Sequence, residues 1–228
     1  MKRISVIIYG PPGSGKSTQA ELVANHFGLI RFDTGKYIAS EIYDPNNRKN
    51  KTVMRQKMLY EKGMLCDRPW VYRIVSRQLK KIIAAGYGVV LSGSPRDPYE
   101  AFDAPGRPGV YTLLKRGYGK KKIFTFILNV RPEHSVSRNS GRKLCGVCRR
   151  AYIIIKTGVL SACPFCGAPL SIRKDDRKII IVDRLEEYKK QTQPIYAGLR
   201  RLDYQINHID GERPPYKVFS DILKFIPK

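Results

Sequence analysis

One stretch decides the fold of this chain, I-S-V-I-I-Y-G-P-P-G-S-G-K-S at residues 4–17. Its apolar start, residues 4–9, predicts a short buried strand, and a helical pattern from Ser17 to Phe27 closes at Gly28. The residues between them match G-x-x-x-x-G-K-[S/T], in which backbone N–H groups and a helix N-terminus surround phosphate oxygens. Strand, glycine loop and helix in this order predict a P-loop that binds a nucleotide.

The P-loop motif also predicts what its side chains do. Lys16 is expected to bridge the β- and γ-phosphates of ATP, and the hydroxyl of Ser17 or Thr18 to approach Mg²⁺. Glycines let the backbone turn inward around the phosphates. The predicted ATP-binding residues of the loop are Gly10, Gly13, Ser14, Gly15, Lys16, Ser17 and Thr18.

Four of the five cysteines form two C-x-x-C pairs, Cys145 with Cys148 and Cys163 with Cys166. This spacing is typical of a tetrahedral Zn²⁺ site in which each pair supplies two thiolates. Because all four ligands come from the protein, the site is closed, and we expect a structural role. Reduced structural cysteines or two disulfides are the alternatives. The fifth cysteine, Cys66, is expected to be a small buried hydrophobic residue.

Strands and helices alternate along the rest of the 228 residues. This pattern predicts an α/β fold, a doubly wound parallel sheet covered on both faces, with small insertions. The cysteine-rich stretch breaks the pattern and is expected to be such an insertion. Beyond the first strand and helix, the expected helices are 35–56, broken near 44–47, then 70–85, 181–201 and 215–226; the expected strands are 88–91, 123–130 and 204–209; and 103–122 is expected to be a loop.

The chain is strongly basic, with 43 Lys and Arg against 19 Asp and Glu and a formal charge of +24. Such a surface favours polyanions, namely nucleotides, RNA or anionic lipid. Two runs concentrate the charge, and solvated loop charge is the favoured explanation of such runs. These runs are Lys115, Arg116, Lys120, Lys121 and Lys122, and Arg48, Lys49 and Lys51. With no RNA-binding module in the sequence, any nucleic-acid binding is expected to be non-specific.

The sequence argues against a membrane protein. No segment approaches about 18 apolar residues, and the apolar run near the N-terminus is too short for a secretory signal. Five cysteines are an odd number for a disulfide scaffold, and two C-x-x-C pairs fit a metal in a reducing compartment better. A cytoplasmic protein is therefore expected.

Further motifs extend the pattern beyond the P-loop, and together they resemble the long-form adenylate kinases, whose lid carries zinc. The resemblance covers residues 4–226 and is weakest over 103–122. The matching stretches are Gly10-Pro11-Pro12-Gly13-Ser14-Gly15-Lys16-Ser17-Thr18-Gln19-Ala20, Asp33-Thr34-Gly35, Gly93-Ser94-Pro95-Arg96, Ser140-Gly141-Arg142, Arg173-Lys174-Asp175-Asp176 and Asp183-Arg184-Leu185-Glu186-Glu187-Tyr188. The resemblance implies a P-loop core at residues 1–33, 67–140 and 177–228, a helical insertion for the nucleoside monophosphate at 34–66, and a zinc-binding lid at 141–176.

The same resemblance implies roles at the acceptor side. Thr34 and Gly35 would open the helices that bind the monophosphate, with Gly93 and Arg96 at its phosphate. Glu100 stands where the family has a glutamine that reads the acceptor base.

On the donor side the resemblance implies a second set of arginines. Arg138 and Arg142 would contact ATP, and the backbone around Arg213 would lie against its base. Arg173 and Arg184 would clamp both nucleotides from the lid and its hinge. The implied catalytic residues are Lys16, Arg96, Arg142, Arg173 and Arg184.

Four positions depart from the family, and all touch the acceptor or the metal. Ser92 and Lys36 replace aspartates that hold waters of Mg²⁺, and Asp33 is a candidate replacement carboxylate. Ala39 replaces an arginine that contacts phosphate. Glu100 can only accept hydrogen bonds, so it is expected to weaken selectivity for adenine.

We therefore expect a monomeric kinase that transfers the γ-phosphate of ATP to AMP, with relaxed choice of acceptor base, using Mg²⁺ with ATP and structural Zn²⁺ in the lid. One alternative is a kinase for GMP, CMP or UMP. The other is a P-loop nucleotide-binding protein of weak kinase activity that docks on RNA or ribosomes.

Overall fold

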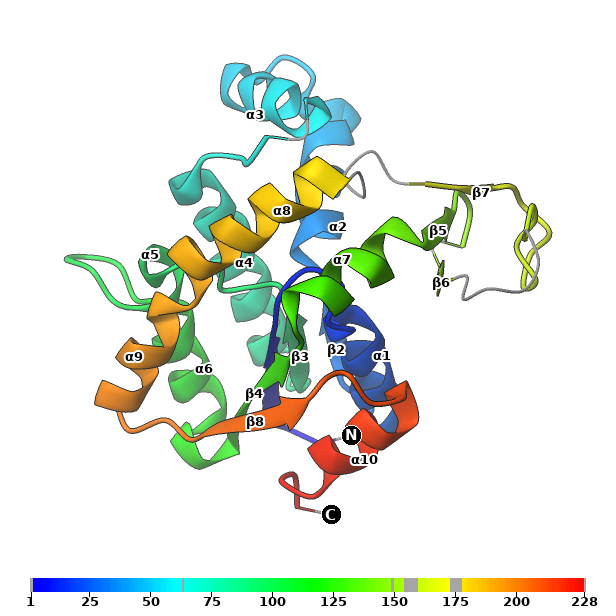
Figure 1. Cartoon of the computed structure of the whole chain (residues 1–228). Coiled ribbons are helices and arrows are strands. Elements are labelled where there is room, and N and C mark those ends of the chain that lie inside the picture. Colours follow the sequence, from blue (N-terminus) through cyan, green and yellow to red (C-terminus); the bar gives the residue numbers. More distant parts are fainter. Residues whose placement is uncertain (1, 63, 149, 154–159, 173–177, 228) are drawn as a thin grey trace.

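The core of the molecule is a five-stranded parallel sheet in the order β2-β3-β1-β4-β8 (Figure 1). The computed structural model describes residues 2–62, 64–148, 150–153, 160–172 and 178–227. This sheet confirms the expected α/β class. Its strands are β1 (Ser5–Tyr9), β2 (Ile30–Phe32), β3 (Val89–Ser92), β4 (Ile123–Asn129) and β8 (Ile206–Asp210).

Helices cover both faces of this sheet and extend beyond its carboxyl edge (Figure 1). They are α1 (Lys16–Phe27), α2 (Thr34–Tyr43), α3 (Lys51–Glu61), α4 (Arg68–Ala84), α5 (Pro98–Ala101), α6 (Val110–Tyr118), α7 (Pro132–Ser140), α8 (Lys178–Glu187), α9 (Pro194–Arg201) and α10 (Pro215–Leu223). Short 3-10 turns η1 (Pro45–Asn47) and η2 (Lys120–Lys122) and a π-helical segment η4 (Tyr188–Thr192) complete the chain.

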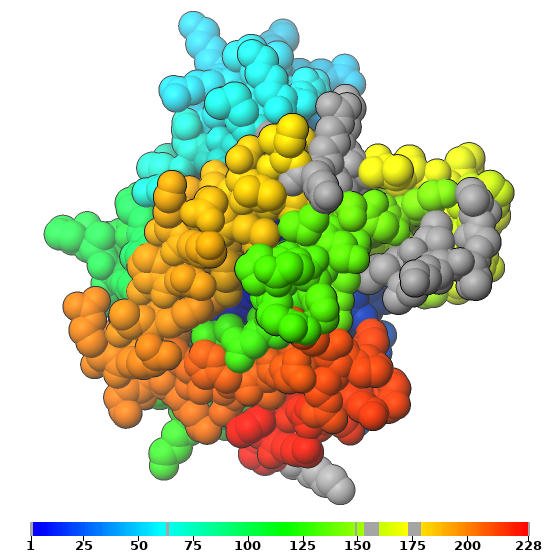
Figure 2. Space-filling model, viewed as in Figure 1, coloured from blue at the N-terminus to red at the C-terminus, as the bar shows by residue number. Residues whose placement is uncertain are grey.

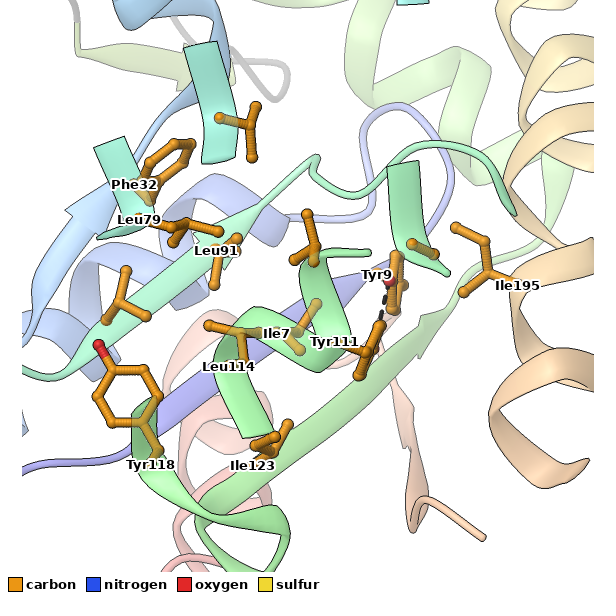
Figure 3. Packing of buried hydrophobic residues seen from close by; sticks show 14 of the residues in the cluster. Ile7, Tyr9, Phe32, Leu79, Leu91, Tyr111, Leu114, Tyr118, Ile123 and Ile195 are labelled. Atoms are coloured by element: carbon orange, nitrogen blue, oxygen red, sulfur yellow. Dashed lines mark hydrogen bonds between the residues drawn. The ribbon is translucent and has the colours of Figure 1, made fainter. Parts of the chain in front are cut away.

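Two apolar clusters, one on each face of the sheet, hold the layers together. Both include β1, in which every residue is buried. Alternate β1 side chains point to opposite faces, so Ile7 joins one cluster and Ile8 the other. The first cluster packs α4, α6 and α9 on the sheet (Figure 3), and the second packs α1 and α10. In the first, the Tyr9 hydroxyl lies 3.3 Å from that of Tyr111, which contacts Thr125 Oγ1 at 3.2 Å. Burial on both faces is why the strand reads as a continuous apolar run.

The expected loop at 103–122 is wrong for its second half, which forms helix α6. Val110, Tyr111, Leu114 and Tyr118 recur at helical spacing and are buried against the sheet. Glycine, proline and basic residues dominate the composition of this stretch, but within the helix Lys115 and Arg116 lie on the exposed face and Gly117 packs closely on Ile83 of α4. The apolar period, rather than the composition, determines the structure here.

Two smaller units extend from the core (Figure 2). Helices α2 and α3 lead away from the sheet, and Ile38 and Ile42 pack on Trp70 and Ile74 of α4. The second unit is an antiparallel sheet of order β6-β5-β7, formed by β5 (Arg142–Cys145), β6 (Ala151–Ile153) and β7 (Leu170–Ser171). They lie where the insertion and the lid are expected, and the exact limits of those domains stay predictions.

Among the described residues, no helix combines the length and the apolar character that a membrane span requires.

Candidate active site

The P-loop follows β1 and packs against helix α7. Gly10 and Gly13 have φ angles of 153° and 75°, which side chains disfavour. A Cβ at Gly13 would lie 2.4 Å from Asn139 Nδ2 and 2.9 Å from the carbonyl oxygen of Ser135. The Ser135 hydroxyl donates to the Pro12 carbonyl. Both α7 contacts therefore fix the loop in the shape that its glycines permit.

Lys16 begins α1 and lies at the mouth of the loop. Its Nζ donates to the carbonyls of Gly10 at 2.7 Å and Pro11 at 2.8 Å. An ammonium has three N–H donors, so one remains for a phosphate oxygen. The buried hydroxyl of Ser14 makes no hydrogen bond within the described residues, which leaves it available to a ligand.

Three arginines from distant segments lie close enough to Lys16 for their charges to act on it. Burial, together with the charges of Arg184, Arg96 and Arg142, lowers the pKa of Lys16 to about 7. These arginines come from α8, from the turn after β3 and from the start of β5. The fold thus brings together three of the predicted catalytic arginines. The fourth, Arg173, lies outside the described residues.

The turn that carries Arg96 is held by buried hydrogen bonds. Glu100 accepts from the Ser94 hydroxyl and, at 2.8 Å, from the backbone N–H of Arg96. Burial raises the pKa of this carboxyl, which both bonds oppose. The Arg96 Nε donates to the Gly93 carbonyl at 2.8 Å. The structure therefore places Glu100 against the backbone of the acceptor turn, and its role at the base stays a prediction.

The segment that follows α8 also supports this turn. Thr192, in the π-helical segment η4, donates from its hydroxyl to the Arg96 carbonyl at 2.7 Å. On the other side, Asp97 caps α5 by accepting from the Glu100 N–H at 2.8 Å and pairs with Arg68 at 3.0 Å. These contacts fix the Arg96 turn relative to α4, α5 and η4.

Thr34 begins α2, where the resemblance implies the acceptor helices. Its side chain is buried, and its hydroxyl has no hydrogen-bond partner among the described residues. A buried hydroxyl without a partner costs free energy unless a ligand supplies one. This observation fits the predicted acceptor site.

On the donor side, Arg138 of α7 binds protein backbone. Its guanidinium donates to the carbonyls of Gly211 at 2.7 Å and Glu212 at 2.9 Å. Glu212 in turn pairs with Arg131 at 2.9 Å, which lowers the pKa of Glu212 to about 2. Arg213 turns its side chain to Asp221, so its backbone, rather than its guanidinium, is presented by this loop. Two arginines near α7 thus fix the loop that is expected to lie against the donor base.

The four predicted metal ligands come together in the small sheet. All four sulfurs lie within 4.8 Å of one another. Cys145 Sγ is 3.4 Å from Cys166 Sγ, and Cys148 Sγ is 3.6 Å from Cys163 Sγ. Zinc–sulfur bonds of about 2.3 Å in a tetrahedron place sulfurs about 3.8 Å apart, whereas a disulfide needs about 2.05 Å. The cluster therefore fits a zinc ion and is not disulfide-bonded.

Cys163 has a partner that the sequence analysis missed. The hydroxyl of Tyr152, on β6, lies 3.1 Å from Cys163 Sγ. A hydroxyl beside a sulfur can stabilise a thiolate ligand by hydrogen bonding. In the sequence Tyr152 lies between the two cysteine pairs. A single sequence does not indicate which residue of such an insertion contacts a sulfur.

The residues fit Mg²⁺ only in part. Mg²⁺ takes oxygen ligands, commonly one or two carboxylates together with substrate phosphates. The hydroxyls of Ser17 and Thr18 are exposed in the first turn of α1 and could ligate an ion. Asp33, the candidate carboxylate, instead caps α2 by accepting from the Lys36 N–H at 3.3 Å. An ion here would be held chiefly by nucleotide phosphates, with a hydroxyl of α1.

Comparisons with known proteins agree with this site. A family model described as an AAA domain matches residues 9–106. The adenylate kinase of Clostridium acetobutylicum is 30% identical over 223 residues, covering 96% of this chain and 97% of the relative. That of Caldanaerobacter subterraneus is 33% identical, covering 96% and 94%. That of Methanothrix thermoacetophila is 32% identical, covering 99% of both chains. Relatives at this identity, matched almost end to end, show the family, and the chain therefore belongs to the adenylate kinase family of phosphotransferases.

Proposed function

We propose that this protein is a nucleoside monophosphate kinase that transfers the γ-phosphate of ATP to AMP. The convergence of Arg96, Arg142 and Arg184 on Lys16 carries the proposal. Phosphoryl transfer spreads negative charge over the equatorial oxygens, so fixed cations accelerate it through positioning and charge stabilisation. Relatives named adenylate kinase along nearly the whole chain support the same reaction.

Each cation has a proposed place in this reaction. Lys16 and Arg142 hold the donor phosphates, and Arg96 holds the acceptor phosphate. Arg184, joined by Arg173 from the lid, binds the transferring group. Mg²⁺ bound to ATP would neutralise phosphate charge, with the Ser17 or Thr18 hydroxyl as the protein ligand.

A coupled assay of ADP formation from ATP tests the function. We expect turnover with AMP as the best acceptor among AMP, GMP, CMP and UMP. ATP binding without transfer to any of the four monophosphates would contradict the proposal and favour a nucleotide-binding role.

Glu100→Gln is expected to change how the enzyme selects among acceptors. A carboxylate leaves adenine N1 facing an anion, whereas an amide can also donate to it. We expect the parent to prefer AMP only modestly over GMP or CMP, and the variant to gain about ten- to a hundredfold in selectivity for AMP. The measurement is kcat/KM for all four monophosphates in both proteins.

The same experiment separates this role from the one that the structure displays. If Glu100 only holds the Arg96 turn, the amide keeps one accepting oxygen and its NH₂ group cannot accept the other hydrogen bond, so every acceptor loses kcat/KM by one factor. A Ser94→Ala variant would then show the same common loss. A parent preference for AMP above about a thousandfold that Glu100→Gln leaves unaltered contradicts base reading.

ATP binding is expected to take up a proton near pH 8. With a pKa of about 7, Lys16 is mostly neutral at that pH, and the ATP phosphates favour the ammonium and raise its pKa. Calorimetry in two buffers of different ionisation enthalpy measures the proton uptake. It should fade as the pH falls below about 6, where Lys16 is already charged in the free protein. Equal heats in both buffers at pH 8 would contradict this assignment.

A further inference from the structure

The edge of the sheet opposite the P-loop is unusually basic. In a parallel sheet all amino ends meet at one edge, and β3, β1, β4 and β8 are successive neighbours there. The segments 2–3, 80–81, 115–122 and 200–201 lead into these four strands, and each carries at least two Lys or Arg residues. Both chain ends also lie at this edge (Figure 1). We name these four segments the amino-edge surface.

Hydrogen bonds and an ion pair join the loops that lead into neighbouring strands at this edge. The Tyr118 hydroxyl, at the end of α6, donates to the Tyr87 carbonyl before β3 at 2.8 Å. Burial raises the pKa of Tyr118 to about 12, and the nearby charge of Arg3 opposes this. Lys120, before β4, pairs at 2.9 Å with Asp203, before β8. The residues that precede β4 therefore contact those that precede β3 and β8, so the basic segments lie side by side along this edge.

Almost no acidic residue offsets this charge. Across residues 2–4, 80–88, 115–122 and 199–205, Asp203 is the only Asp or Glu. Cations in the last turn of a helix stabilise its negative end, which accounts for some of the charge on α4, α6 and α9. That effect does not extend to Arg3, Lys121 and Lys122, which lie outside those helices and are exposed. Like charges gathered in this way repel one another, so the arrangement is costly unless an anion binds.

The nucleotide site does not explain this surface. The P-loop follows the carboxyl end of β1, and the Arg96 turn follows the carboxyl end of β3. The phosphates of ATP and of the acceptor would therefore bind at the opposite edge of the sheet. A five-residue strand rising about 3.3 Å per residue already separates the two edges by more than a Debye length at physiological salt.

We propose that the amino-edge surface binds single-stranded RNA without sequence preference. Cations spread over several loops match the spaced phosphates of a strand, and aromatic rings among them can stack on bases. Tyr87 is 40% exposed there, and Lys120 Nζ lies 5.4 Å from the ring of Tyr204. A lipid surface fits less well, because α6 and α9 turn their apolar faces inward, with Leu114 and Leu199 fully buried.

Binding of a labelled oligouridylate of about 20 nucleotides, followed by fluorescence anisotropy over about 50–300 mM salt, tests this proposal. The test variant is Lys121→Gln, Lys122→Gln, Arg200→Gln and Arg201→Gln. The matched control is Arg48→Gln, Lys49→Gln, Lys51→Gln and Lys62→Gln, which removes the same charge from exposed positions near α3. We expect the test variant to lose at least about tenfold in affinity and about three in the log–log salt slope, because each phosphate contact contributes about 0.7 to that slope.

The control variant should lose much less, and the test variant should keep the parent's ADP-forming activity with free nucleotides. A second variant, Tyr87→Ala, should weaken binding of the single strand more than binding of a duplex of equal length. Equal losses in the test and control variants would show that net charge alone attracts RNA and would overturn the proposal. Parent protein that fails to bind the oligonucleotide but binds vesicles rich in anionic lipid would overturn it in favour of a membrane surface.

Discussion

Lys16→Ala is expected to lower kcat by about a thousandfold while the protein stays folded. The lysine acts on charge that grows as the γ-phosphate leaves, so its loss raises the barrier more than it weakens binding of ATP. Within the described residues its Nζ donates to the Gly10 and Pro11 carbonyls, and no other element of the fold depends on these two contacts. Removing a partly buried cation from among three arginines also relieves repulsion. The fold should therefore be no less stable.

Steady-state kinetics with ATP and AMP measures the loss, and thermal unfolding checks the fold. Lys62→Ala is the matched control, because Lys62 is an exposed lysine that no proposed role involves. Activity of Lys16→Ala within about tenfold of the parent would contradict the assignment of the P-loop lysine to transfer. Loss of activity together with a lower melting temperature would leave kcat uninterpretable, and Lys16→Met, which keeps the aliphatic stem, would then serve as the test.

Local motifs in the sequence predicted the phosphate loop and the cysteine cluster. Gly10 to Ser17 follows a strand and opens a helix, and each of these features lies within one short window. The spacing of the two cysteine pairs is equally local. Helix α6 was missed although Gly109 and Gly119 bound it, because its basic composition outweighed a clear apolar period.

The remaining parts depend on contacts between distant segments. Thr192 binds the Arg96 carbonyl across 96 positions of sequence, and nothing near Thr192 indicates it. A Cβ at Gly198 would lie 2.4 Å from the ring of Phe102, so this glycine is required by packing that a single sequence cannot display. Glu100 was placed at the base by its position in a motif, whereas its hydrogen bonds depend on Ser94, a residue with no expected role. A motif therefore predicts roughly where a residue lies, whereas its hydrogen-bond partners depend on contacts that only the fold creates.

Loss of zinc is expected to abolish kinase activity while the core stays folded. Strand β5 carries Arg142 at one end and the expected zinc ligand Cys145 at the other, so the metal site and the proposed catalytic arginine share one short strand. The lid has little apolar core of its own, and structural zinc contributes about 10–16 kcal/mol in small domains. Without the ion the strand that positions Arg142 should unfold, and kcat should fall by about a hundredfold or more.

Cys145→Ser and Cys163→Ser test this directly, with Cys66→Ser as the control, since Cys66 lies near α3 and α4, away from the cluster. Metal analysis should give one zinc per chain in the parent and the control, and far less in the two ligand variants. Trp70 is the single tryptophan, and it lies on α4 and is buried against Ile38 and Ile42 of α2, so its fluorescence reports the body rather than the lid. After chelation we expect unaltered tryptophan fluorescence, faster amide exchange over residues 142–171 and lost turnover.

Parent protein purified without chelator that holds well under one equivalent of zinc, or ligand variants that keep full activity, would show that this lid does not depend on a metal. If Trp70 fluorescence changed together with the lid, the ion would instead stabilise the whole molecule, because lid and core would then unfold as one cooperative unit.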